Sequence, residues 1–358
     1  MENSIKKLLK DNALVFDRAL EKLIPRAYTD KSLIQTLGPP HYDYSPEAIN
    51  RALAEPIWEF LDRGGKRWRP TLFLLICEAL GKNPDDLLDF AIIPEIIHNG
   101  TIMIDDIEDS SEFRRGKPCT HRLFGIDIAV NAGNTMYYLP LLTLASYREK
   151  LPKETVTKLY EIYVQEMVNI SFGQATDIAW HKGLVDVDRI TENQYLQMCI
   201  LKTGTLARMS AKLAAVLAGA DNDLTKRIGR YAETIAVAFQ IRDDILDLTG
   251  GRFSEGKGGF GQDITEGKRT LLVINSLSKA KVRDRRRLLE ILDMHTADQT
   301  IKREAISIIE RSGSIEYAKE YARDIVAEGW NEINQSLPQS KAKEKLRAFA
   351  SYLVEREI

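Results

Sequence analysis

Residues 94–109 read PEIIHNGTIMIDDIED, and residues 239–247 read FQIRDDILD. Both stretches are apolar and end in the same pattern, D-D-x-x-D. In an α-helix, positions i and i+4 lie on one face and position i+1 is turned about 100° from position i, so each stretch would direct two or three carboxylates toward one place. Carboxylates packed that closely repel one another, and burying them without partners is costly. Magnesium takes oxygen ligands and keeps positions for water and phosphate. We therefore expect two facing helices that hold Mg²⁺ and a diphosphate.

Composition narrows the class of protein. The chain has 358 residues, of which 44% are hydrophobic, enough for a large core, and its net charge of −2 argues against a nucleic-acid partner. The three cysteines, Cys77, Cys119 and Cys199, are far apart and form no C-x-x-C pair, which favours a reducing compartment. The N-terminus lacks the apolar region of a signal peptide, and no apolar run reaches the roughly 20 residues of a membrane span. We expect a soluble, cytoplasmic protein without a membrane span.

Helical periodicity dominates the chain, and no alternating pattern typical of strands appears. The sequence therefore predicts an all-α bundle with one large domain at residues 46–358, preceded by a helical extension at residues 1–45. The helical patterns before residue 280 cover residues 51–61, 72–80, 94–107, 129–146, 153–170, 192–219 and 223–248.

Several polar motifs interrupt these patterns. The stretch GGKRWRP at residues 64–70 and the basic turn RRGKP at residues 114–118 combine glycine with cations that suit a phosphate group. Residues 250–261 include six glycines directly after the second aspartate cluster and could form a lid. Each basic motif alone could be an ordinary helix-ending turn, and KTG at residues 202–204 and GQATD at residues 173–177 say little alone. Together with the two aspartate clusters, these motifs indicate one or two large anionic substrates.

In these motifs the chain resembles the trans-prenyl diphosphate synthases. The resemblance runs from about Pro56 to Ile274 and follows the order of that family: GGKRWRP, the stretch from His98 to His121 with DDIED and RRGKP, GQATD, KTG, FQIRDDILD and GQDITEGKRTLL. The first half is most similar to geranylgeranyl diphosphate synthases of eukaryotic type, which share the helix written here NAGNTMY at residues 131–137. The second half differs from that subgroup, because its DDILD has the full family motif.

The resemblance implies an all-helical homodimer with a deep central cavity, in which three Mg²⁺ ions bind an allylic diphosphate beside isopentenyl diphosphate. The implied metal ligands are Asp105, Asp106, Asp109, Asp243, Asp244 and Asp247. The implied contacts of the allylic diphosphate are Arg114, Lys202, Lys257 and Lys268, and those of isopentenyl diphosphate are Lys66, Arg69, His98 and Arg115. The side-chain oxygens of Thr203 and Gln240 would stabilise a carbocation.

Product length depends on the floor of the cavity. The residues five and four positions before Asp105 are Gly100 and Thr101, which are small, so an aromatic side chain does not block the tail there. Tyr137 and Tyr138 are the next candidates for the floor. If they cap the cavity, the product is geranylgeranyl diphosphate, and if they are ordinary core aromatics, the product is longer.

Two further alternatives stay open. A terpene cyclase also ionises allylic diphosphates on Mg²⁺, but it usually lacks two intact clusters together with the basic motifs for a second diphosphate. A non-catalytic subunit of a heteromeric prenyl synthase typically loses the aspartates.

Overall fold

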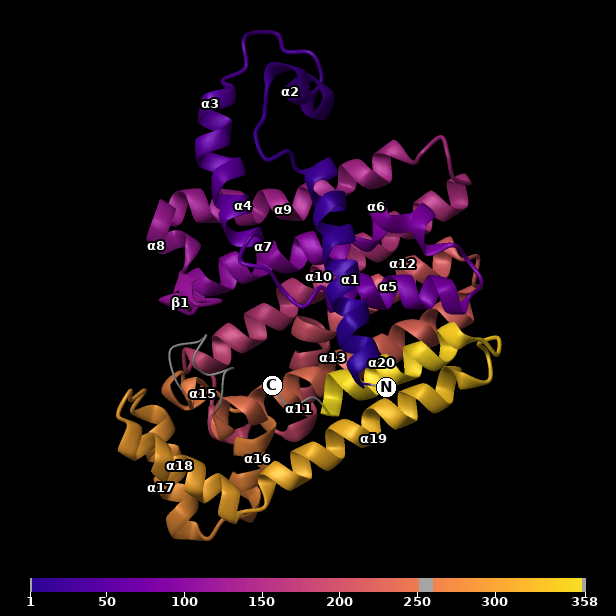
Figure 1. The fold of residues 1–358 in the computed structure, drawn as a ribbon. Coiled ribbons are helices and arrows are strands. Elements are labelled where there is room, and N and C mark those ends of the chain that lie inside the picture. Colours follow the sequence, from indigo (N-terminus) through magenta and orange to yellow (C-terminus); the bar gives the residue numbers. More distant parts are fainter. Residues whose placement is uncertain (1, 251–259, 356–358) are drawn as a thin grey trace.

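Helices form nearly all of the structure, a computed structural model that describes residues 2–250 and 260–355. The first half contains α1 (Glu2–Leu23), α2 (Asp30–Leu37), α3 (Pro46–Ile49), η1 (Asn50–Ala54), α4 (Glu55–Leu61), α5 (Trp68–Ala79), η2 (Pro84–Leu87), α6 (Leu88–Ala91), α7 (Ile93–Glu108), α8 (Thr120–Phe124), α9 (Ile126–Ser146) and α10 (Lys153–His181). The second half contains η3 (Val187–Arg189), α11 (Glu192–Cys199), η4 (Ile200–Gly204), α12 (Thr205–Leu217), α13 (Asn222–Thr249), α15 (Gln262–Thr265), α16 (Leu271–Lys279), α17 (Val282–Asp293), α18 (Gln299–Arg311), α19 (Ser314–Asn334) and α20 (Lys341–Glu355). The predicted all-α class is confirmed (Figure 1).

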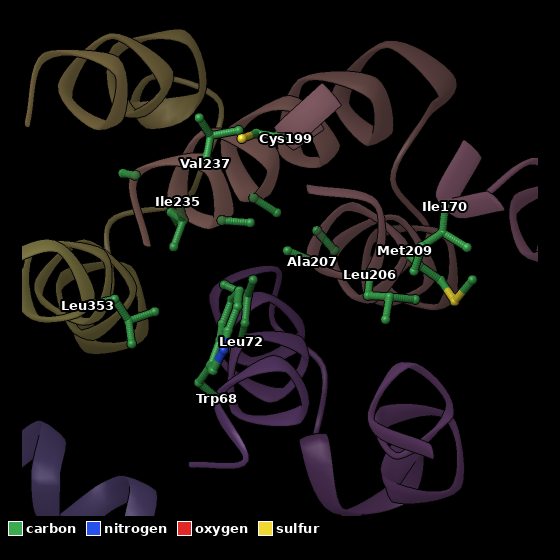
Figure 2. Close-up of a cluster of buried hydrophobic side chains, with 14 of the residues drawn as sticks. Trp68, Leu72, Ile170, Cys199, Leu206, Ala207, Met209, Ile235, Val237 and Leu353 are labelled. Atoms are coloured by element: carbon green, nitrogen blue, oxygen red, sulfur yellow. The ribbon is translucent and has the colours of Figure 1, made fainter. Parts of the chain in front are cut away.

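The core lies around α13, which packs against α12 on one side and α19 on another. Figure 2 shows part of this core, where Trp68 and Leu72 of α5 approach Leu206 of α12 and Ile235 of α13. The ring of Trp68 also stacks on that of Phe239, with 5.4 Å between the ring centroids. Because Phe239 precedes the second aspartate cluster by four residues, this apolar packing fixes the position of α13 where the carboxylates begin.

The N-terminal helix belongs to the same core. Phe16 and Leu20 of α1 are fully buried in the main cluster of hydrophobic side chains. Residues Tyr28, Leu33 and Ala54 form a separate small cluster, and α2 and α3 lie at one end of the molecule (Figure 1). The boundary expected near residue 45 therefore does not separate α1 from the core of the large domain.

Two local features differ from the predicted helices. The pattern at residues 192–219 is divided by η4, a π-helical turn that contains the KTG motif. The basic turn forms a hairpin between β1 (Phe113–Arg114) and β2 (Lys117–Pro118). Its two loop residues, Arg115 and Gly116, both have positive φ, which suits a tight hairpin loop. Strands of two residues are too short to give an alternating sequence pattern.

One stretch, Pro84–Glu108, is long and apolar enough to compare with a membrane span. However, 61% of its most apolar window is buried inside the fold. Its apolar residues thus pack against other helices of the same chain, as in a core helix.

Candidate active site

A cavity of about 1730 Å³ lies between α7, α9, α10, η4 and α13. Asp105 and Asp109, at the C-terminal end of α7, line one wall, and Asp243 and Asp244 of α13 line the wall that faces it. The structure thus places carboxylates of both clusters around one cavity.

Asp105 of the first cluster is held by two side-chain donors. Its Oδ1 accepts hydrogen bonds from Gln174 Nε2 at 2.7 Å and from Lys202 Nζ at 3.1 Å. Burial by itself would raise the pKa of Asp105, but the charges of Lys202 and Lys268 outweigh it and hold that pKa well below its ordinary value. Burial, and then the charge of Asp105, raise the pKa of Asp109 to about 7. The two acids on this wall therefore titrate very differently.

The middle aspartate of the first cluster and the last of the second do not line the cavity. Asp106 is buried, and its Oδ1 accepts a hydrogen bond from Arg114 Nε at 2.7 Å. Asp247 is also buried and accepts from the backbone N–H groups of Gln262 at 3.2 Å and Asp263 at 3.0 Å, so it caps the start of α15. Of the six carboxylates expected to bind the metal, four line the cavity, and Asp106 and Asp247 do not.

Asp244 is tied to the KTG motif through side chains. It accepts hydrogen bonds from the hydroxyl of Tyr195 at 2.6 Å and from Gln240 Nε2 at 2.8 Å. The Oε1 of Gln240 in turn accepts from the hydroxyl of Thr203 at 3.1 Å. Burial raises the pKa of Asp244 to about 6 despite these donors. This chain fixes the orientation of the Gln240 amide, whose oxygen lies at the cavity wall beside Thr203.

Lysines balance the charge of the acids. Lys202, in the π-helical turn η4, lies with its Nζ 2.5 Å from Oδ2 of Asp177 as well as 3.1 Å from Asp105. Lys268 pairs with Glu266 and lies 4.0 Å from Asp109. Burial by itself would lower the pKa of Lys202, yet Asp105 and Asp177 raise it, so the ammonium group stays charged. π-Helical turns are frequent at functional sites, and this one places Lys202 opposite the first cluster.

The basic motifs meet at another part of the cavity wall. Lys66, Arg69, His98 and Arg115 all line it, as does Arg114. Burial lowers the pKa of Arg69 to about 10, which still leaves it charged at neutral pH. Burial, and then the charges of Arg69 and Arg115, lower the pKa of His98 well below its ordinary value, so its imidazole is neutral at pH 7. Of the predicted substrate contacts, Lys257 lies outside the described residues, together with most of the glycine-rich segment.

One part of the cavity wall is mainly apolar and aromatic. Thr101, Tyr137 and Tyr138 line it, together with Leu141, Tyr163, Met167 and Ile170. Gly100 does not line it. A Cβ atom at Gly100 would lie 2.7 Å from the carbonyl oxygen of Gly133 and 2.9 Å from Cβ of Met136. Gly100 therefore serves the close contact between α7 and α9 rather than the floor.

Several wall residues were missing from the sequence-based site. Gln174 and Asp177 contact Asp105 and Lys202, and the hydroxyl of Tyr195 binds Asp244. The motif GQATD was the signal for the first two, but its spacing alone points to no partner. Tyr195 and Tyr163 carry no local signal, because only helix packing brings them to the wall.

The acids of the wall suit magnesium in an open site. Within the described part of the chain, no three His, Cys, Asp or Glu side chains converge as a closed metal centre. Magnesium is commonly held by one or two carboxylates, with water and substrate phosphates as further ligands. Pairs of aspartates on facing walls, surrounded by lysine and arginine, fit a metal–diphosphate complex better than a metal bound by protein alone.

Comparison with known proteins identifies the family. The family model described as polyprenyl synthetase matches residues 50–309. The chain belongs to this family. It is 31% identical to a geranylgeranyl pyrophosphate synthase of Geoglobus acetivorans, over 99% of both chains. It is 36% identical to a geranylfarnesyl diphosphate synthase of Aeropyrum pernix, over 82% of this chain and 91% of the other. The crystal structure of a geranylgeranyl pyrophosphate synthetase from Pyrococcus horikoshii superposes with a TM-score of 0.83 at 30% identity, covering 99% of both chains.

Membership in the polyprenyl synthetase family makes this chain a trans-prenyltransferase. Enzymes of this family depend on magnesium and use isopentenyl diphosphate and an allylic diphosphate. The predicted reaction class is thereby confirmed. The names of the similar proteins indicate products of more than one length.

Proposed function

We propose that this prenyltransferase makes geranylgeranyl diphosphate by adding isopentenyl diphosphate head-to-tail to an allylic diphosphate. The observation that carries the proposal is the shape of one cavity. Aspartates of both clusters and several cations line one part of it, and apolar and aromatic side chains of α9 and α10 line another. A charged diphosphate and an apolar prenyl tail need these two environments.

The residues that would hold magnesium are Asp105 and Asp109 on one wall and Asp243 and Asp244 on the other, and we propose three ions. When bound, magnesium supplies positive charge that neutralises the developing charge of the leaving diphosphate. Asp106 and Asp247 would act indirectly. Asp106 holds Arg114 in position, and Asp247 holds the backbone at the start of α15. Arg114, Lys202 and Lys268 line the same cavity and would bind the allylic diphosphate.

The reaction begins when the C–O bond of the allylic diphosphate breaks and leaves an allylic carbocation. The Gln240 carbonyl oxygen and the Thr203 hydroxyl, held 3.1 Å apart, would direct negative dipoles at that cation. The alkene of isopentenyl diphosphate then forms the new C–C bond, and the released diphosphate takes the proton that is lost. The apolar wall excludes water, which would otherwise quench the cation.

Isopentenyl diphosphate would bind at Lys66, Arg69, His98 and Arg115. Because His98 is neutral, it would donate a hydrogen bond to phosphate without adding charge. Tyr137 and Thr101 would limit the tail, with Tyr163 on the neighbouring helix α10. A longer-chain product remains the alternative if the tail passes these side chains.

The test is a product-length assay. Purified protein is incubated with Mg²⁺, labelled isopentenyl diphosphate and dimethylallyl, geranyl or farnesyl diphosphate, and the dephosphorylated products are separated by length. A single geranylgeraniol band is expected. A ladder of longer prenols would support the proposed reaction but would show that the product is longer than geranylgeranyl diphosphate. No elongation would overturn the proposal in favour of a cyclase or a non-catalytic subunit.

We further propose that the enzyme is a cytoplasmic homodimer. Helices α8, α9 and α10 expose large apolar side chains on one connected part of the fold, namely Leu123, Ile126, Val130, Leu142, Val164, Val168 and Phe172. Such a surface favours association. Within the described residues the three cysteines are free and buried, which suits a reducing compartment. Sedimentation equilibrium is expected to give twice the chain mass, and Ile126→Glu, at an exposed position that does not line the cavity, should shift the species toward the monomer.

A further inference from the structure

Helix α7 also carries a row of buried polar side chains beside its cavity-lining carboxylates, and the first of them, Glu95, lines the cavity itself. Glu95, Asn99 and Asp106 are 2%, 0% and 1% exposed, respectively. Their spacing of four and seven residues places them on one face of the helix. Burying these polar groups is costly unless each has partners. The partners of all three are arginines of the two basic motifs.

Glu95 and Asn99 hold two arginines side by side. Oε1 of Glu95 accepts a hydrogen bond from Nη1 of Arg67 at 3.0 Å, and Oδ1 of Asn99 accepts one from Nη2 of Arg115 at 3.1 Å. The Nδ2 of Asn99 donates to the carbonyl oxygen of Glu95 at 2.7 Å, which fixes which atom of the amide faces Arg115. One helical turn of α7 thus orients a guanidinium group from each basic motif.

The two guanidinium groups meet at the glycine pair of the first motif. A Cβ atom at Gly65 would lie 3.5 Å from Nη2 of Arg115 and 3.6 Å from Nη1 of Arg67. Nη1 of Arg115 also donates to the carbonyl oxygen of Gly64. These are ordinary van der Waals distances, so both guanidinium groups lie directly against the loop that carries Lys66.

Both arginines have an unusual backbone. Arg67 and Arg115 have φ of 47° and 54°, in the left-handed region that residues other than glycine rarely adopt. Such a conformation persists where surrounding contacts determine it, and it occurs frequently at ligand sites. Arg67 also contacts the N-terminal helix, since its Nη2 lies 3.3 Å from Oδ1 of Asp17 on α1.

Charge explains why these contacts are needed. Arg67, Arg69 and Arg115 lie near one another, and like charges at close range repel. Glu95 pairs with buried Arg67, and where burial lowers the pKa of Arg69 and of Arg115, the charge of Glu95 is the main influence that raises it again. Without it, the cations would separate from one another or draw in solvent.

We propose that Glu95 and Asn99 are positioning residues that hold Arg67 and Arg115 in a fixed pair for the diphosphate of the homoallylic substrate. Asp17 extends this support to the N-terminal helix α1. The proposal rests on the proposed function, and it names residues that bind no substrate atom themselves. Their effect should therefore fall on one substrate, because the allylic diphosphate would be held at the aspartates and Lys202.

The test compares Glu95→Gln and Asn99→Ala with the wild type in steady-state kinetics. We expect the KM for isopentenyl diphosphate to rise by about 10-fold, the loss typical when support of a ligand-binding group is removed. The KM for the allylic substrate should differ from the wild-type value by no more than about 2-fold, much less than the KM for isopentenyl diphosphate. The matched control is Glu166→Gln, which removes another buried carboxylate, one that pairs with Arg208 away from the cavity. It should lower stability and leave the ratio of the two KM values unchanged.

Either of two results would overturn the proposal: an unchanged KM for isopentenyl diphosphate, or an equal rise in both KM values as from general damage. If Glu95→Gln does not fold, Asp17→Asn decides the question, because that side chain is 46% exposed and its loss leaves the core intact. It should raise the same KM in the same direction, though less, and no rise would count against the proposal. Titration with inorganic diphosphate without Mg²⁺ needs no turnover, so weaker binding by Glu95→Gln would still support the arginine pair if the proposed reaction failed.

Discussion

Lys202 and Asp105 form an ion pair of 3.1 Å although they are 97 residues apart in the chain. The contact links η4 to the end of α7, and Asp177 of α10 completes it. Three segments that are distant in sequence thus share one charged centre. Because Lys202 favours the ionised form of Asp105, this carboxylate has the charge state that magnesium requires.

Asp105→Ala and Asp243→Ala should each lower turnover by orders of magnitude. Both side chains line the cavity and neither belongs to the hydrophobic core, so the helical circular dichroism spectrum should be unchanged. The measurement is kcat with saturating substrates and Mg²⁺. Asp284→Ala, on the distant helix α17, is the control. If either cavity variant keeps a turnover close to that of the wild type, these aspartates are not the metal ligands.

Replacement of Tyr137 and Tyr138 by alanine should lengthen the product. Tyr137 should account for most of the effect, because it packs against the core while the side chain of Tyr138 is 67% exposed. The assay compares product lengths from the double variant and from each single variant. Tyr42→Ala, at an exposed position away from the cavity, is the control. An unchanged product from the double variant would show that the floor lies elsewhere.

Gly173→Ala should disturb the position of Lys202. A Cβ atom at Gly173 would lie 2.6 Å from the carbonyl carbon of Leu201 and also meet the backbone nitrogen of Lys202, so η4 would have to move. We expect a loss of about 1–3 kcal/mol in the free energy of unfolding, as for other overpacked sites, with reduced turnover. Denaturant unfolding and kcat measure the two effects.

Gly204→Ala provides the comparison for that variant. The Cβ atom there would meet Cγ of the Glu233 side chain at 3.2 Å, and a side chain can move more easily than a backbone. Its effect on stability should be smaller. Equal effects of the two substitutions would mean that the contact between α10 and η4 does not determine the position of Lys202.

The buried Glu166 should give the protein a pH-dependent stability. Burial by itself would raise the pKa of Glu166, but hydrogen bonds and charges of Arg208 and then Lys212 outweigh it and lower the pKa below 4.5. The folded protein then releases a proton more easily than the unfolded chain. This stabilisation is present above the unfolded pKa and is lost as the pH falls through the folded value.

Glu166→Gln tests this effect through the free energy of unfolding as a function of pH. At pH 7 the variant should be less stable by about 3–5 kcal/mol, the usual cost of breaking a buried ion pair. The difference from the wild type should shrink as the pH falls from about 4.5 through the lowered pKa of folded Glu166, because the carboxylate then becomes protonated and uncharged like the glutamine. A difference that stays constant down to pH 3 would contradict this explanation.

The helical class and the two aspartate helices follow from the sequence because helical periodicity is local. Asp105 and Asp109 share a face whatever the rest of the chain does, and the apolar residues before them bury the helix. The basic motifs are also recognisable, because glycine next to arginine and lysine suits a phosphate wherever it lies. The family resemblance adds the order of these motifs and the reaction class, which the comparisons confirm.

Tertiary structure alone decided which of these residues face the cavity. The rotation of a helix about its axis depends on packing, and it turns Asp106 and Asp247 toward protein donors while Asp105 and Asp243 line the wall. Gly100 likewise belongs to the contact between α7 and α9. The sequence by itself determined the chemical groups and their local spacing, since these are properties of one helix. The partners of each group, such as Lys202 for Asp105, arise from packing between distant segments, which no local pattern encodes.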